Sequence, residues 1–264
     1  MNSSYKVIVA HPDDEILFFS SVLKNAIQTI FCFGPSENKN LTIGRQKLKA
    51  QLPLNNVLFL DLLESNVLNS ANWKKPKKNN EGIAVSNNFY SYQENYKNLK
   101  VQLSKVIGYG ETIFTHNPWG EYGHEEHVQV FRVIMSLAND LNLKVFVSCY
   151  VSNKSYLFMT MEQHLLSDEV HTGKPDTNLI SIFKNIYQSN LCWTWHEEYC
   201  WPKFELFFKI NKDVDYLKFK TSRMGTLPLS MLSGNYKTNV LKQIVGKILP
   251  TNIKNLIKPL MRFA

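Results

Sequence analysis

Two short clusters of acidic and imidazole side chains stand out in this chain of 264 residues. The first, His-Pro-Asp-Asp-Glu at residues 11–15, places one imidazole and three carboxylates within five positions. The second is His-Glu-Glu-His at residues 124–127. Burying such groups is costly unless they are paired or bind a metal, and imidazole nitrogens and carboxylate oxygens are ordinary ligands of Zn²⁺. The clusters therefore indicate a metal site, with helix capping by the Asp pair as the alternative.

Each cluster stands between a stretch typical of a buried strand and a stretch typical of a helix. Residues 6–10 and residues 111–115 form short apolar, β-branched runs ahead of the two clusters. Apolar helical patterns follow at residues 16–23 and 127–141. In an open α/β sheet, ligands bind at the carboxyl ends of the strands. We therefore expect both clusters to lie at that edge of a sheet, as two halves of one site.

The rest of the first 151 residues also alternates strands with helices. The further strands and helices that we expect cover, in chain order, residues 26–33, 44–51, 57–62, 92–107 and 144–151. This alternation predicts an α/β fold, with a Rossmann-like, mostly parallel sheet and helices on both of its faces. Because no Gly-x-Gly-x-x-Gly follows the first strand, dinucleotide binding is not expected. Residues 64–90 are polar and aperiodic, and we interpret their lysine-rich centre as a solvated turn, with contact to an anionic substrate as the alternative.

The two clusters resemble the signature motifs of the PIG-L/LmbE-type N-acetylglucosaminyl deacetylases. The first family motif, AHPDDE, stands unchanged at residues 10–15, and the second, His-x-x-His preceded by Tyr-Gly, stands at residues 122–127. The resemblance covers residues 5–150 and, faintly, residues 180–200. It implies a zinc-dependent hydrolase that removes the acetyl group of an N-acetylated amino sugar, giving a free amine and acetate. The sugar would be similar to N-acetylglucosamine, either linked to a lipid or a nucleotide or part of a glycan.

The resemblance also implies roles for individual residues. His11, Asp14 and His127 would bind the metal, and Asp13 would be the general base. His124 would act on the leaving group or on the oxyanion. Zn²⁺ is the expected metal, with Fe²⁺ and Co²⁺ as alternatives, because a site of nitrogen and oxygen ligands does not separate these ions.

Two further residues are implied to face the substrate. Tyr122 would help to bind the carbonyl group. Arg45 would lie close to the substrate pocket, and a surface position on its helix is the alternative. The chain departs from the family pattern at residues 18–21, where Phe-Phe-Ser-Ser replaces small residues, and at residues 125–126, where Glu-Glu replaces Pro-Asp.

Two other functions fit the same motifs. One is an amide hydrolase that acts on another small conjugate, such as an antibiotic or a sugar–thiol. The other is an inactive, metal-binding module that docks on membranes or protein partners. The presence of Asp13, the residue expected to be the base, favours an enzyme over an inactive module.

The net charge of +8 is distributed unevenly along the chain. Residues 216–264 contain nine Lys or Arg and no Asp or Glu, which leaves 21 basic and 22 acidic residues in residues 1–215. We therefore expect a deacetylase-like domain at residues 1–215 and a basic, amphipathic helical tail at residues 216–264. Such a tail could lie on an anionic membrane surface, or pack on the domain with its lysines in water. Nucleic acid is not an expected partner, since the sequence contains no recognised nucleic-acid-binding module.

Membrane and redox features of the sequence are few. No stretch approaches the roughly 20 apolar residues of a membrane span, and no basic-then-apolar leader opens the sequence. We expect a cytoplasmic protein, held at the inner face of the membrane if the tail binds there. The four cysteines are expected to be buried thiols, with a second zinc site near residues 192–200 as the alternative.

Overall fold

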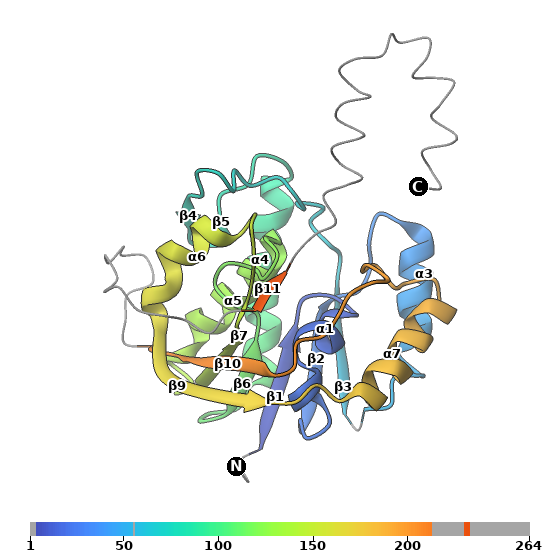
Figure 1. Cartoon of the computed structure of the whole chain (residues 1–264). Helices are drawn as coiled ribbons and strands as arrows, with labels where there is room; N and C mark the ends of the chain where they lie inside the picture. The colour runs from blue at the N-terminus through green and yellow to red at the C-terminus, as the bar shows by residue number, and fades with distance from the viewer. Residues whose placement is uncertain (1–3, 55, 213–229, 233–264) are drawn as a thin grey trace, which may run out of the picture. The chain divides into compact units, whose positions relative to one another are not determined.

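The computed structural model describes residues 4–54, 56–212 and 230–232. The chain divides into two compact units, residues 1–231 and 232–264, and only Leu232 of the second unit is described. The first unit is built on a seven-stranded sheet in the order β3-β2-β1-β6-β7-β10-β9 (Figure 1). Its strands are β1 (Tyr5–Val9), β2 (Gln28–Phe33), β3 (Val57–Leu62), β6 (Thr112–Thr115), β7 (Lys144–Ser148), β9 (Leu166–Gly173) and β10 (Glu205–Ile210).

The sheet is mainly parallel. The five strands from β3 to β7 run parallel to their neighbours, whereas β10 is antiparallel to both β7 and β9. Strands β2 and β3 lie on one side of β1, and β6 and β7 lie on the other, so the strand order reverses between β1 and β6. Such a reversal is where open α/β sheets bind ligands. Ile8 of β1 pairs with Thr115 of β6, so the segments that follow these strands begin side by side.

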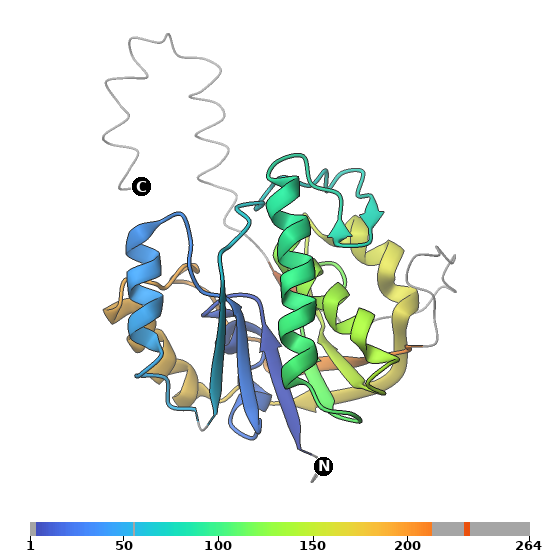
Figure 2. The same cartoon turned by 180° about the vertical axis from the view of Figure 1, so that it is seen from behind.

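Helices cover both faces of the sheet. Helices α4 (Phe89–Val106) and α5 (Glu125–Ala138) pack together over one face (Figure 2). Helices α1 (Asp14–Phe18), α2 (Ser20–Leu23) and α7 (Thr177–Ser189) lie on the other, and α3 (Lys39–Leu48) packs beside α7 (Figure 1). The fold class predicted from the sequence is therefore confirmed.

The main apolar core lies between the sheet and helices α4 and α5. It forms because these strands carry apolar side chains and the two helices present apolar stripes at helical spacing. Its fully buried members include Ile8, Ile30, Ile113, Leu99, Leu103, Val130 and Ile134. The helix that begins at the second motif is thus fixed against the same strands that carry the site.

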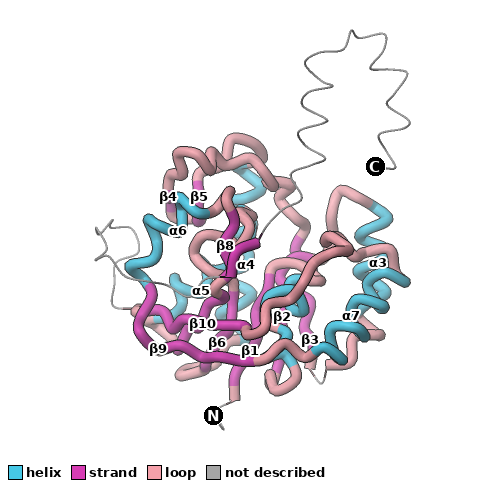
Figure 3. Tube along the Cα trace, viewed as in Figure 1, coloured by secondary structure: helices cyan, strands magenta, loops and turns pink. Residues whose placement is uncertain are grey.

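The segment between β3 and α4 is mostly loop, with a short hairpin of β4 (Lys78–Asn79) and β5 (Gly82–Ile83) (Figure 3). Lys74, Lys75 and Lys77 at its centre are exposed, as expected of a solvated turn, whereas the neighbouring Trp73 is buried and packs against Phe158 of α6 (Tyr156–Glu162). The strand expected at residues 144–151 is divided into β7 and β8 (Tyr150–Ser152), and β8 pairs with β11 (Ser230–Leu232).

The remaining expectations concern the cysteines, membrane-spanning helices and the tail. All four cysteines are free thiols, and three are buried as expected, but the expectation is wrong for Cys200, which is exposed. Among the described residues, no helix is long and apolar enough to cross a membrane. Of the predicted helical tail, only residues 230–232 are described, and they form strand β11; the rest of the tail and the predicted domain boundary at residues 215–216 lie outside the described residues.

Candidate metal centre and active site

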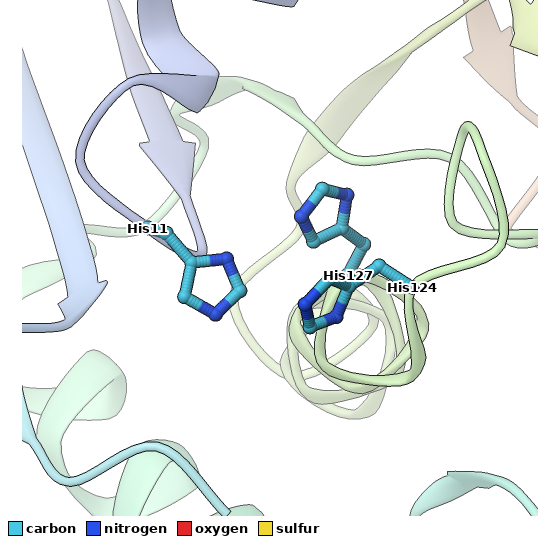
Figure 4. A group of neighbouring side chains, drawn as sticks. All are labelled: His11, His124 and His127. Carbon is cyan, nitrogen blue, oxygen red and sulfur yellow. The ribbon is translucent and has the colours of Figure 1, made fainter. Parts of the chain in front are cut away.

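Four imidazoles and the carboxylate of Asp14 gather where β1 and β6 end. The Oδ2 atom of Asp14 lies 3.3 Å from His11 Nδ1, 3.2 Å from His127 Nε2 and 3.5 Å from His116 Nε2. Figure 4 shows the ring of His11, from the loop after β1, facing the rings of His124 and His127 at the start of α5. All five side chains are buried.

Two overlapping groups of these side chains could hold a metal ion. They are His11–His124–His127 and Asp14–His116–His127, and within each group the candidate ligand atoms lie within 4.8 Å of one another. His127 belongs to both groups. Hydrogen bonds to the imidazole nitrogens distinguish the four histidines, because a nitrogen that accepts a backbone N–H has no lone pair left for a metal.

Two of the histidines have a nitrogen occupied in this way. The backbone N–H of Ala10 donates to His116 Nε2 at 2.8 Å, and the Nδ1 atom of His116 lies 3.0 Å from the carboxylate of Glu121. The backbone N–H of Glu126 donates to His124 Nδ1 at 3.2 Å, which makes His124 the N-cap of α5. In its neutral form His124 therefore carries its proton on Nε2, as a hydrogen-bond donor.

The other two histidines each direct a nitrogen toward Asp14. His127 Nδ1 lies 2.8 Å from Glu121 Oε2, and within the described part of the chain His127 Nε2 is buried without a hydrogen-bond partner. His11 Nε2 lies 2.8 Å from Glu126 Oε2, which leaves His11 Nδ1 on the side of Asp14. Imidazoles that bind metals usually donate their second N–H to a carboxylate in this way.

The distances between these atoms also suit a metal. In a tetrahedral site with bonds of about 2.0–2.1 Å, ligand atoms are roughly 3.3 Å apart. The separations of Asp14 Oδ2 from His11 Nδ1 and from His127 Nε2 are 3.3 and 3.2 Å. The Asp14 oxygen thus lies at a ligand-to-ligand distance from one nitrogen of each imidazole, and these donor types suit a divalent ion such as zinc. The set His11–Asp14–His127 combines members of the two groups above.

Two glutamates fix the orientation of these imidazoles. Burial alone would raise the pKa of Glu121, but the neighbouring His116 and His127 lower it to about 2. The Oε1 atom of Glu121 accepts the backbone N–H of Asn117 and the hydroxyl of Ser148. Glu121 is thus held as an ionised acceptor for both of its histidines.

The second glutamate, Glu126, lies in the first turn of α5 and links two loops. Its Oε1 atom accepts the backbone N–H of Ser65 at 2.5 Å, and its Oε2 atom accepts His11. The adjacent Glu125 instead accepts backbone N–H groups of residues 69 and 71 and the indole N–H of Trp73. At this departure from the family pattern, Glu126 therefore contacts His11 directly, whereas Glu125 holds the loop around Trp73.

Asp13 has an unusual backbone conformation. Its φ of 105° is in the left-handed region, which costs a non-glycine residue roughly 1–3 kcal/mol and is concentrated at functional sites. The backbone N–H of Asp13 donates to Glu15 Oε2 at 2.9 Å, and the Oδ2 atom of Asp13 accepts the hydroxyl of Thr194 at 2.5 Å. Burial and the neighbouring Asp14 raise the pKa of Asp13 to about 7, although the hydrogen bond from Thr194 opposes this.

Aromatic side chains form one wall of the site. The ring of Tyr122 lies 5.7 Å from His124, 5.3 Å from His127 and 4.7 Å from Trp195, measured between ring centroids. The buried ring of Phe18 lies 6.1 Å from both His127 and Trp195. Phe18, at the end of α1 and at a position where the sequence departs from the family pattern, thus contributes to the wall.

Arg45 is buried, with 4% of its surface exposed, so the alternative of a surface arginine is wrong. Its Nη1 atom donates to the backbone oxygen of Gly34 and pairs with Glu64, whose carboxylate lies 3.8 Å from His11 Nε2. Arg45 also lines a cavity of about 160 Å³ together with Lys49 and other residues of α3 and β3. Arg45 is therefore linked to His11 of the candidate metal centre through the carboxylate of Glu64.

The structure brings the residues predicted from the sequence together at one edge of the sheet. The sequence did not identify Glu64, Glu121, Thr194 or Tyr187 as parts of the site. Only Glu121 has a sequence signal, since a carboxylate between His116 and the second motif is the kind of residue that orients metal-binding imidazoles. The others come from separate segments and have no local pattern.

Sequence comparison gives limited information about this chain. No protein-family model matches it. An uncharacterized protein, L374 of Acanthamoeba polyphaga mimivirus, is 25% identical over an alignment of 160 positions that covers 55% of this chain and 64% of that protein. The match thus spans less than two thirds of that relative's length.

Three solved structures share parts of the architecture at low similarity. A deacetylase–teicoplanin complex from the teicoplanin biosynthesis pathway gives a TM-score of 0.45 at 12% identity, covering 79% of this chain and 100% of that one. The A40926 pseudoaglycone deacetylase Dbv21 gives a TM-score of 0.45 at 8% identity, covering 81% of this chain and 100% of that one. N,N′-diacetylchitobiose deacetylase from Pyrococcus horikoshii gives a TM-score of 0.38 at 12% identity, covering 71% of this chain and 74% of that one. Similarities this low carry no functional argument.

Proposed function

We propose that this protein is a zinc-dependent N-deacetylase of the PIG-L/LmbE type, acting on an N-acetylated amino sugar. The observation that carries the proposal is the buried carboxylate of Asp14, which faces one nitrogen each of His11 and His127. The backbone strain at Asp13, directly beside these donors, supports a catalytic role for that segment.

The proposed metal ligands are His11 through Nδ1, Asp14, and His127 through Nε2. The separations of Asp14 Oδ2 from the two imidazole nitrogens and the unpartnered Nε2 of His127 support this set. When bound, a divalent metal would polarise the acetyl carbonyl and lower the pKa of a water molecule at its open position. His116 and His124 are not proposed as ligands. In each of these neutral rings one nitrogen accepts a backbone N–H, so the other nitrogen carries the proton and has no lone pair for a metal.

The remaining residues would divide the proton transfers of amide hydrolysis. Asp13 accepts the proton of the water that attacks the acetyl carbonyl. As the C–N bond breaks, the amine takes up the proton that Asp13 received from the water. His124, which carries its proton on Nε2, donates a hydrogen bond to the oxyanion, and the hydroxyl of Tyr122 donates to the same carbonyl oxygen. Arg45 is proposed to border the substrate pocket through its pair with Glu64.

A substrate panel tests this function. The zinc-loaded protein would be incubated with N-acetylated sugars, sugar nucleotides, lipid-linked sugars and acylated antibiotic conjugates, and products would be followed by mass spectrometry with acetate measured in parallel. We expect equal amounts of amine and acetate from at least one amino sugar. If only an antibiotic conjugate were hydrolysed, the proposed amino-sugar substrate would be wrong, and the protein would be an amide hydrolase of that conjugate. No turnover across the panel by fully metal-loaded protein would instead favour a metal-binding module.

The basic tail is proposed to bring the site to a lipid-linked substrate. This part rests on the sequence, since residues 233–264 lie outside the described residues. Nine positive charges and no acidic residue in residues 216–264 suit an anionic membrane surface. The native location would then be the cytoplasmic face of a membrane.

A further inference from the structure

The segment after α7 returns to the candidate active site and contacts the first motif. We call residues 192–201 the strap. The indole N–H of Trp201 donates to the backbone oxygen of Ile16 at 2.8 Å, and the hydroxyl of Tyr199 donates to that of Leu17 at 3.2 Å. Both acceptors belong to α1. The strap is therefore attached to the helix that begins at Asp14, at two points beyond the site itself.

A third contact of the strap goes to a functional side chain. The hydroxyl and the backbone N–H of Thr194 both donate to the Oδ2 atom of Asp13, at 2.5 and 3.2 Å. Thr194 is exposed, whereas only 3% of Asp13 is exposed. Because Trp201 and Tyr199 already fix the strap to α1, the hydroxyl of Thr194 is not needed to attach the strap.

Asp13 is also held from its backbone side by α7. Its backbone N–H donates to Glu15 Oε2, and the hydroxyl of Tyr187 donates to Glu15 Oε1 at 2.6 Å. This chain of contacts supports the left-handed conformation of Asp13. These contacts fix the backbone of Asp13 but leave its carboxylate free to rotate. The two hydrogen bonds from Thr194 both end on the Oδ2 atom, so they can fix that rotation.

We propose that Thr194 is a positioning residue that sets the orientation of the Asp13 carboxylate for proton transfer. A carboxylate fixed through one oxygen presents its other oxygen in one direction, and catalysis depends steeply on such alignment. The proposal rests on the proposed deacetylase function and on Asp13 as its base. It assigns a role to a strap residue 181 positions away from Asp13 in the sequence.

The test compares Thr194→Val, which keeps the shape and the backbone N–H, with Thr194→Ser, which restores the hydroxyl. Thr172→Val, at an exposed position on the edge strand β9, is the matched control. For a substrate found in the panel, we expect kcat to fall about tenfold in Thr194→Val with KM unchanged, because a hydrogen bond to a charged group is lost. Thr194→Ser should recover most of the rate. Metal content should not change in any of the three variants, and Thr194→Val should lower the melting temperature only slightly, because its backbone N–H still donates to Asp13.

Several outcomes would overturn the proposal. They are a wild-type kcat in Thr194→Val, a raised KM with kcat unchanged, and failure of Thr194→Ser to recover the rate. Wild-type protein that releases no acetate from any substrate would overturn the deacetylase function itself, which is a separate result.

A double variant shows whether Thr194 acts through Asp13. Asp13→Gly removes the carboxylate, and glycine adopts the local φ without strain. In this background Thr194→Val should leave the residual rate unchanged, because the group that it positions is absent. A further tenfold loss would mean that Thr194 acts independently of Asp13, and the proposal would be wrong.

Discussion

The segments that follow β1 and β6 contribute to the candidate site in different ways. The β1 segment is short: His11 and Asp14 face each other at the centre, and the carboxylate of Asp13, the residue between Pro12 and Asp14, accepts Thr194. The β6 segment is longer and brings three histidines, but two of them, His116 and His124, each have a nitrogen occupied by a backbone N–H. The number of buried imidazoles therefore overstates the number of available ligands, and the hydrogen bonds to each ring decide which of them can bind a metal.

The same contrast separates the acidic residues of the two segments. After β1, Asp13 is the proposed base and Asp14 is a proposed metal ligand. After β6, Glu121 and Glu126 hold imidazoles in place, and Glu125 holds the loop around Trp73. Substitutions in the β1 segment should therefore affect turnover most, and substitutions of the glutamates should affect metal affinity or stability.

The largest effect is expected from Asp13→Asn. An amide cannot accept the proton of the attacking water, so kcat should fall by roughly 10²–10⁴-fold. The metal should remain bound, because Asp13 is not among the proposed ligands. Steady-state kinetics and elemental analysis of the same preparation would check both points. A near-normal rate would show that another group is the base.

A smaller effect is expected from Glu121→Gln. The amide would no longer accept N–H groups from both His116 and His127, and loss of such a partner typically weakens metal binding by 10–100-fold. Glu125→Gln, four residues later in the first turn of α5, is the matched control. It disturbs the contacts to residues 69–73, so it should lower the free energy of unfolding by about 1–3 kcal/mol. Its metal affinity should match wild type in competition with a chelator, and equal weakening in both variants would remove the distinction between the two glutamates.

The smallest effect on catalysis is expected from deleting residues 237–264. Hydrolysis of a small, water-soluble substrate should be unchanged, whereas sedimentation with anionic liposomes should be lost. Each cation near such a surface contributes roughly 1 kcal/mol, and screening over about 8–10 Å should weaken binding as salt rises. The six cations removed are Lys237, Lys242, Lys247, Lys254, Lys258 and Arg262. Full-length protein that stays in the supernatant at low salt would exclude membrane docking.

The first half of the fold could be predicted from the sequence because its strands are continuous apolar runs and its helices are amphipathic. The range expected for β3 equals the observed range. The ranges expected for β1, β2 and β6 differ from the observed strands by at most two residues at either end. The later strand β9 was not predicted, since it lies at the edge of the sheet with mostly exposed or partly exposed side chains and has no apolar pattern.

The site was predictable where its chemistry is concentrated within one segment. His11, Asp13, Asp14, His124 and His127 stand in two compact motifs. Thr194 and Tyr187 could not be found in this way, because single hydroxyl groups have no pattern and their partners lie more than 170 positions away. The available nitrogen of each histidine could not be read from spacing either, since it depends on backbone N–H groups that only the folded chain brings close.

Metal affinity in two matched histidine variants tests the central claim most directly. Asparagine at position 124 can still cap α5, so His124→Asn removes the imidazole and keeps the helix start. His127→Asn makes the same substitution three residues later. We predict that His124→Asn retains one tightly bound zinc per chain, as wild type does, and that His127→Asn loses it, with both variants folded. Zinc retained by His127→Asn, or lost from His124→Asn, would contradict the assignment of the metal to His11, Asp14 and His127.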